Sequence, residues 1–134
     1  MRIKEYLMSE KNDRLYSRQH EWAIFEEDGT CRVGISDYAQ KELGNLVFAN
    51  LPEEGDEVTS DTPFADVESI KTVSDVYSPV TGKVISVNEA VMDDPTLINS
   101  DPYGSWFAVI GDITAKGELL TAEEYDEYLK TLKA

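Results

Sequence analysis

The chain has 134 residues, the length of a single domain that can bury a core of its own. Its 12 basic and 27 acidic side chains give a formal charge of −15 at pH 7, which excludes a binder of nucleic acid or of an anionic membrane surface. One cysteine and one histidine exclude an internal disulfide, a thiolate metal cluster and a multi-histidine zinc site.

The N-terminus lacks the apolar stretch of a secretory signal, and its acidic residues are untypical of a mitochondrial transit peptide. No apolar run in the chain is long enough to span a bilayer. We therefore expect one domain over residues 1–134 with an N-terminal extension at 1–13. The protein is predicted to be cytoplasmic and monomeric, without membrane association.

The first predicted strand covers residues 21–27, with Trp22 and Ile24 on one face and Ala23 and Phe25 on the other. Asp28-Gly29 predicts a type I′ hairpin turn, which needs positive φ at both positions. A second strand at 30–35 follows this turn.

Ser36 or Asp37 can cap a short helix at 37–43, which Gly44 would end. The segment 88–104 contains three turn clusters and at most one short helix. The remaining predicted strands are 46–51 (buried, stopped by Pro52), 64–69, 72–77, 83–87 after a turn at 78–82, and 106–110 (buried).

A capping box formed by Thr121 and Glu124 starts a C-terminal helix. Its apolar face is Tyr125, Tyr128, Leu129 and Leu132. Many short strands cut by turns, followed by one helix, predict a mostly-β domain with short helices and a C-terminal helix.

Outside the segment 66–75, few residues indicate a catalytic or binding site. The many carboxylates guarantee accidental pairs, and no G-x-S-x-G or glycine-rich phosphate loop occurs. His20 is expected to be structural, and Cys31 to be a small core residue. Neither a catalytic residue nor a metal site is predicted.

The exception is Lys71, the single lysine between two β-prone runs in the segment 66–75. A lysine at a hairpin tip is solvated and mobile, so it could be a plain surface residue or a site that an enzyme acylates with a cofactor. A Schiff-base nucleophile would need a desolvated amine, and the flanking acids oppose that. The spacing alone leaves the first two readings open.

Short motifs in one order cover nearly the whole chain. They are HEW at 20–22, VGISDYAQ at 33–40, LG at 43–44, LPEEGD at 51–56, VESIK at 67–71, SDVYSPVTG at 74–82, VNEA at 87–90, LIN at 97–99, DPYG at 101–104 and Trp106. In this order and spacing the chain resembles the H-protein family of the glycine cleavage system.

The resemblance implies a hybrid barrel-sandwich of the lipoyl/biotinyl type, with a lipoyl group (lipoate as cofactor) in amide linkage to Lys71. Gly55 and Gly82 resemble the glycines that flank the modified lysine in such domains, each in a turn that feeds a strand. Biotin carriers have methionine on both sides of the lysine, and Ile70 and Thr72 stand there in this chain.

The resemblance also implies a non-catalytic carrier. It would take an aminomethyl group from a pyridoxal-phosphate-dependent glycine decarboxylase to a tetrahydrofolate-dependent aminomethyltransferase, and dihydrolipoyl dehydrogenase would reoxidise it. Two alternatives are an H-like lipoyl carrier or lipoate relay for another multienzyme redox system, and an unmodified β-sandwich that binds partners through its acidic face.

Four further site residues follow from the resemblance. Glu68 and Ser69 adjoin the lysine and are expected to serve recognition by the lipoylating enzyme. Glu21 and Asp75 are expected to line a cleft where their carboxylates face the ammonium of the aminomethyl cargo.

Overall fold

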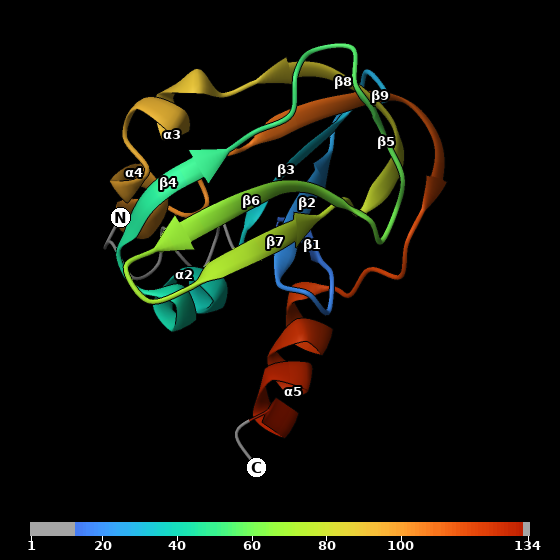
Figure 1. The fold of residues 1–134 in the computed structure, drawn as a ribbon. Helices are drawn as coiled ribbons and strands as arrows, with labels where there is room; N and C mark the ends of the chain where they lie inside the picture. Colours follow the sequence, from blue (N-terminus) through green and yellow to red (C-terminus); the bar gives the residue numbers. More distant parts are fainter. Residues whose placement is uncertain (1–12, 133–134) are drawn as a thin grey trace, which may run out of the picture.

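The computed structural model describes residues 13–132, which form two antiparallel β-sheets with short helices around them (Figure 1). The larger sheet has the order β1 (Leu15–Tyr16), β2 (Glu21–Phe25), β3 (Cys31–Ile35), β9 (Ala108–Lys116), β8 (Val80–Val87), β5 (Glu57–Val58). The smaller sheet has the order β4 (Leu46–Asn50), β6 (Pro63–Ser69), β7 (Val73–Tyr77). The predicted mostly-β barrel-sandwich is confirmed.

Side-chain alternation along the strands builds the core. Trp22 and Ile24 pack in one apolar cluster with Tyr16 and Tyr125, whereas Ala23 points into another cluster with Cys31. A third cluster joins the inner face of the small sheet to β3 and the short helices. Because Cys31 is fully buried, it is a core residue as predicted, and burial raises the pKa of its thiol to about 12.

Helix α2 (Asp37–Leu43) has the predicted bounds and caps. The Ser36 hydroxyl accepts a hydrogen bond from the Ala39 N–H at 3.2 Å. Gly44 follows with φ 81°, a backbone conformation that favours glycine, and its N–H donates to the Gln40 carbonyl.

Two short helices, α3 (Glu89–Asp93) and α4 (Thr96–Ser100), occupy the segment for which at most one was predicted. Asp94 separates them: its side chain accepts hydrogen bonds from the N–H and the hydroxyl of Thr96, which starts α4. The C-terminal helix α5 (Ala122–Leu132) has the predicted capping box, with Thr121 and Glu124 bonding each other's backbone N–H. No helix within residues 13–132 is both long and apolar enough to cross a membrane.

The predicted type I′ turn between β2 and β3 is wrong. Gly29 has φ 87°, but Asp28 is not among the residues with positive φ. The Gly29 N–H donates to the Glu26 carbonyl and the Glu26 N–H to the Thr30 carbonyl, so the connection is a longer loop ending on a left-handed glycine. The Asp28 carboxylate binds the Thr30 N–H and stabilises this loop.

Three other predictions about strands are also corrected. Strand β4 is not buried throughout, because it is an edge strand with Val47 and Phe48 in solvent. Gly82 lies within β8 rather than in a turn, and a side chain there would collide with the Gly111 carbonyl of β9. Strand β9 starts at Ala108 and runs on to Lys116, because its second half pairs with β8.

Candidate functional site

The hairpin of β6 and β7 ends in a tight turn beside α2 (Figure 1). Lys71 lies in this turn, next to Gly44 at the end of α2. The Ser69 N–H donates to the Thr72 carbonyl at 2.8 Å and closes the turn. The Ser69 hydroxyl accepts from the N–H groups of both Lys71 and Thr72 at 3.2 Å. Ser69 is only 8% exposed, so it fixes the backbone of the turn from beneath the lysine.

The side chain of Lys71 is exposed, and its stem lies over the end of α2. A methyl group added to Gly44 would lie 3.5 Å from Lys71 Cε and 3.7 Å from Nζ. These are ordinary contact distances, so the stem packs next to Gly44, and it is the positive φ of this residue that favours glycine. The unpaired carbonyl groups of a helix end attract a cation, which favours this position of the ammonium.

Asn99, in α4, holds the backbone on which Lys71 rests. Its Nδ2 donates to the Gly44 carbonyl at 2.9 Å and to Gln40 Oε1 at 3.0 Å, and its Oδ1 accepts from the Leu46 N–H at 2.9 Å. The sequence placed Asn99 in a family motif but offered no role for it, because its partners lie more than fifty residues away in the chain.

Glu21 is 2% exposed and lies at the free edge of β7. Its Oε1 accepts from the Ser17 hydroxyl at 2.5 Å and its Oε2 from the Tyr77 N–H at 3.3 Å. Burial raises the pKa of Glu21 to about 7, although both hydrogen bonds lower it. Tyr77 ends β7, about 13 Å of strand beyond Val73, so Glu21 is remote from the hairpin tip.

Glu68 and Asp75 lie on the outer face of the small sheet. Glu68 pairs with Val73 of β7, and Asp75 pairs with Asp66 of β6. Asp75 is exposed and Glu68 half-buried. The structure therefore brings Lys71, Ser69 and Glu68 together at the tip, whereas Asp75 lies further along the hairpin and Glu21 at its far end.

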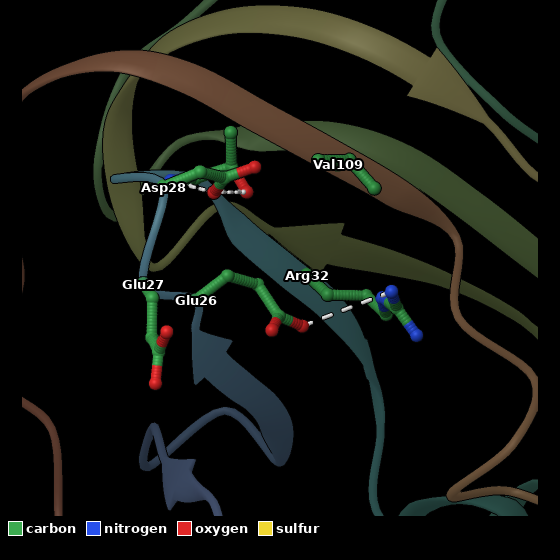
Figure 2. A pocket seen from close by; sticks show the side chains of 6 residues that line it. Glu26, Glu27, Asp28, Arg32 and Val109 are labelled. Atoms are coloured by element: carbon green, nitrogen blue, oxygen red, sulfur yellow. Dashed lines mark hydrogen bonds and ion pairs between the residues drawn. The ribbon is translucent and has the colours of Figure 1, made fainter.

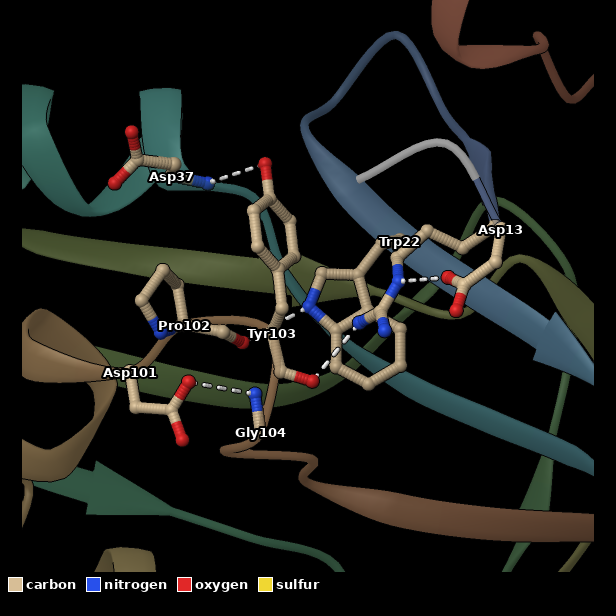
Figure 3. A network of polar contacts seen from close by, with 8 residues as sticks. Asp13, Trp22, Asp37, Asp101, Pro102, Tyr103 and Gly104 are labelled. Carbon is tan, nitrogen blue, oxygen red and sulfur yellow. Dashed lines mark hydrogen bonds and ion pairs between the residues drawn. The ribbon is translucent and has the colours of Figure 1, made fainter. Parts of the chain in front are cut away.

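Two polar networks fix the elements behind the site. In the first, Arg14 is buried over the Trp22 ring and donates to the Tyr103 carbonyl at 2.9 Å, and the Trp22 indole N–H donates to the Pro102 carbonyl (Figure 3). The Asp37 N–H reaches the Tyr103 hydroxyl at 3.5 Å, which ties this network to the start of α2 (Figure 3).

The second network joins α5 to α2. The Tyr125 hydroxyl lies 2.8 Å from both His20 Nδ1 and the Ser36 hydroxyl that caps α2. Burial lowers the pKa of His20, and its ring packs 4.7 Å from that of Tyr38. These contacts agree with a structural role for His20.

A hollow of about 530 Å³ lies elsewhere, at the loop between β2 and β3 (Figure 2). Its lining is acidic, and Arg32 pairs there with Glu26 at 3.7 Å. Within the described part of the chain, no cluster of histidine, cysteine or acidic side chains could hold a metal ion.

A barrel-sandwich that presents an exposed lysine on a fixed hairpin turn defines the class of lipoyl- and biotinyl-type carrier domains. The profile of one family, described as "Glycine cleavage H-protein", matches residues 14–132. The chain therefore belongs to the glycine cleavage H-protein family. Its role is that of the lipoyl carrier of glycine cleavage.

Individual relatives agree. The glycine cleavage system H protein of Lachnoclostridium phytofermentans is 56% identical over 116 residues, covering 87% of this chain and 91% of the relative. The probable glycine cleavage system H protein of Pyrococcus horikoshii is 53% identical over 125 residues, covering 91% and 93%. A crystal structure of the H protein from Mycobacterium marinum superposes with a TM-score of 0.82 at 43% identity, covering 92% of this chain and 98% of that one.

Proposed function

We propose that Lys71 is the residue that carries the lipoyl group, in amide linkage through Nζ. The observation that supports this most strongly is the turn itself: Ser69 fixes the backbone on both sides of an exposed lysine. The amine can therefore reach an enzyme's active site while the body of the protein stays outside. A plain surface lysine has no need of such a turn.

The surroundings of Lys71 fit a lipoyl group. The stem lies next to Gly44 without a clash, and Ile70 and Val73 beside it are apolar and exposed, as suits an aliphatic chain. When bound, the group supplies a ring disulfide that takes up and releases the aminomethyl cargo. The protein itself tethers that group and orients it, which raises its effective concentration at each enzyme.

The proposal extends to the partners. We expect glycine decarboxylase, aminomethyltransferase and dihydrolipoyl dehydrogenase to act in turn on one arm, with the chain as a non-catalytic cytoplasmic monomer. The formal charge of −15 favours partners with basic surfaces. Residues 1–12 lie outside the described part, so the N-terminal extension stays a prediction.

Glu21 and Asp75 have different roles in this proposal. Asp75 offers an exposed carboxylate along the hairpin that can pair with a cationic cargo. Both oxygens of Glu21 already accept hydrogen bonds, so its role is to hold the edge of β7 to the segment 17–21.

The assignment of Lys71 is tested by intact mass after incubation with a lipoate–protein ligase, lipoate and ATP. We expect one lipoyl group on the parent chain and none on Lys71→Ala. Lys83→Ala is the matched control, because Lys83 is exposed on β8 and should stay free. A lipoyl group on Lys71→Ala would contradict the assignment.

A further inference from the structure

Exposed apolar side chains gather at the lysine hairpin. Four large hydrophobic side chains in the hairpin turn, β7 and the neighbouring strand β4 are exposed: Ile70 (84%), Val73 (61%), Phe48 (59%) and Val47 (42%). We call these four the hairpin patch. The other exposed large hydrophobics are scattered over five elements: Phe25, Ile85, Met92, Leu97 and Leu132.

The strand register places two residues of the hairpin patch, Phe48 and Val73, on the outer face of the small sheet, one on each side of Glu68. Phe48 of β4 pairs with Glu68 of β6, and Glu68 pairs with Val73 of β7. These three side chains form one row across the outer face, with cross-strand neighbours about 5 Å apart. Ile70 adjoins Lys71 in the turn, so the row and the lysine occupy the same end of the sheet (Figure 1).

Nothing within the described chain covers the hairpin patch, in contrast to Phe25, over whose ring Lys116 Nζ lies at 4.8 Å. Several exposed apolar side chains gathered at one end of a sheet are typical of a protein-binding surface. Acidic side chains lie among and beside these residues: Glu68 lies within the row, and Asp66 and Asp75 form the next row. A complementary partner has an apolar surface with basic side chains around it.

We propose that the hairpin patch is the docking surface for the enzyme that acylates Lys71. This inference rests on the proposed function. The glycine cleavage enzymes meet the far end of a long arm and can work at a distance from the hairpin. The acylating enzyme must bring its active site to Nζ itself, and its surface then has to cover the residues around the turn.

The reaction at that interface is an acyl transfer from lipoyl-adenylate. A bond forms between Nζ and the lipoyl carbonyl carbon, the mixed-anhydride bond breaks, and AMP leaves with the electron pair. The amine proton passes to solvent. The hairpin patch touches none of these atoms, so it should govern the encounter rather than the chemistry.

The experiment measures lipoylation rates by intact mass over a range of carrier concentrations, using a lipoate–protein ligase with lipoate and ATP. For Phe48→Ser we expect a KM about tenfold higher with kcat within twofold of the parent, since a buried aromatic anchor commonly contributes a decade or more. Val73→Thr keeps the branched shape that suits a strand and should raise KM severalfold without loss of fold. Ile85→Ser and Phe25→Ser, on the large sheet, are the matched controls and should leave KM unchanged.

Unchanged KM in folded Phe48→Ser and Val73→Thr would overturn the inference, as would a fall in kcat alone. A further overturning result is normal lipoylation of these variants with impaired transfer from glycine decarboxylase, which would assign the hairpin patch to that enzyme. If the parent chain itself is not lipoylated on Lys71, the proposed function fails instead, so the two failures are distinguishable.

Discussion

Glu21 shows that a sequence motif can single out a residue without revealing the surroundings of its side chain. Its position in the HEW motif marked it as a site residue, but its 2% exposure depends on Ser17 and Tyr77, and Tyr77 lies 56 residues away. No local pattern shows such a contact. Lys71 is the opposite case, because an exposed hairpin tip follows from its own neighbours.

The raised pKa of Glu21 makes folding stability depend on pH. Below pH 4.5 the carboxyl is protonated in both folded and unfolded states. Between pH 4.5 and about 7 only the folded state keeps the proton, so stability falls as pH rises, by on the order of 3 kcal/mol once the pH exceeds the folded pKa of about 7. His20 has a lowered pKa and acts in the opposite sense.

Glu21→Gln removes this dependence. Urea unfolding at pH 5 and pH 8 should show that the parent loses at least about 1 kcal/mol more than the variant on going to the higher pH. The contribution of His20 cancels in this comparison. Glu68→Gln is the control for a carboxylate on the outer face, and its pH dependence should follow the parent; parallel curves for Glu21→Gln and the parent would refute the linkage.

At the scale of elements, the sequence was most informative where the signal is local. Alternation located β2 and β3, the strands β6 and β7 were also predicted, and Ser36 and Gly44 delimited α2. It failed where pairing decides: β4 is exposed because it is an edge strand, and the β2–β3 loop has the shape that its register requires. The contact of Lys71 with Gly44 at the end of α2 joins elements that are distant in the chain, so it was not predictable.

Asn99 holds the backbone at Gly44 and Leu46, so Asn99→Ala should loosen the junction of α2 and β4. We expect a loss of about 1–3 kcal/mol in unfolding free energy, because the Gly44 carbonyl and the Leu46 N–H lose their partner. Amide exchange at Leu46 should also become faster. Asn50→Ala is the matched control, since its hydrogen bond to Asp66 is exposed and its removal should change stability by under about 0.5 kcal/mol. Equal effects of the two substitutions would show that Asn99 does not hold the junction of α2 and β4.

At the scale of the whole molecule, two sheets carry Lys71 and the hairpin patch at one end of the smaller sheet. The class of fold and Lys71 could be predicted from the motifs and their order. The hairpin patch could not, since Phe48 lies in a strand that was predicted to be buried, and only the register places Phe48 and Val73 on the outer face. The structure thus adds a surface to the lysine that the sequence had already indicated.

The central claim is that the chain acts as a carrier through Lys71 alone. The most direct measurement is release of labelled CO₂ from carboxyl-labelled glycine by glycine decarboxylase, with this protein as the sole acceptor. The lipoylated parent should support release up to one CO₂ per carrier in the absence of the other enzymes. Lys71→Arg, taken through the same lipoylation procedure, should support none, and release with Lys71→Arg equal to that of the parent would contradict the account.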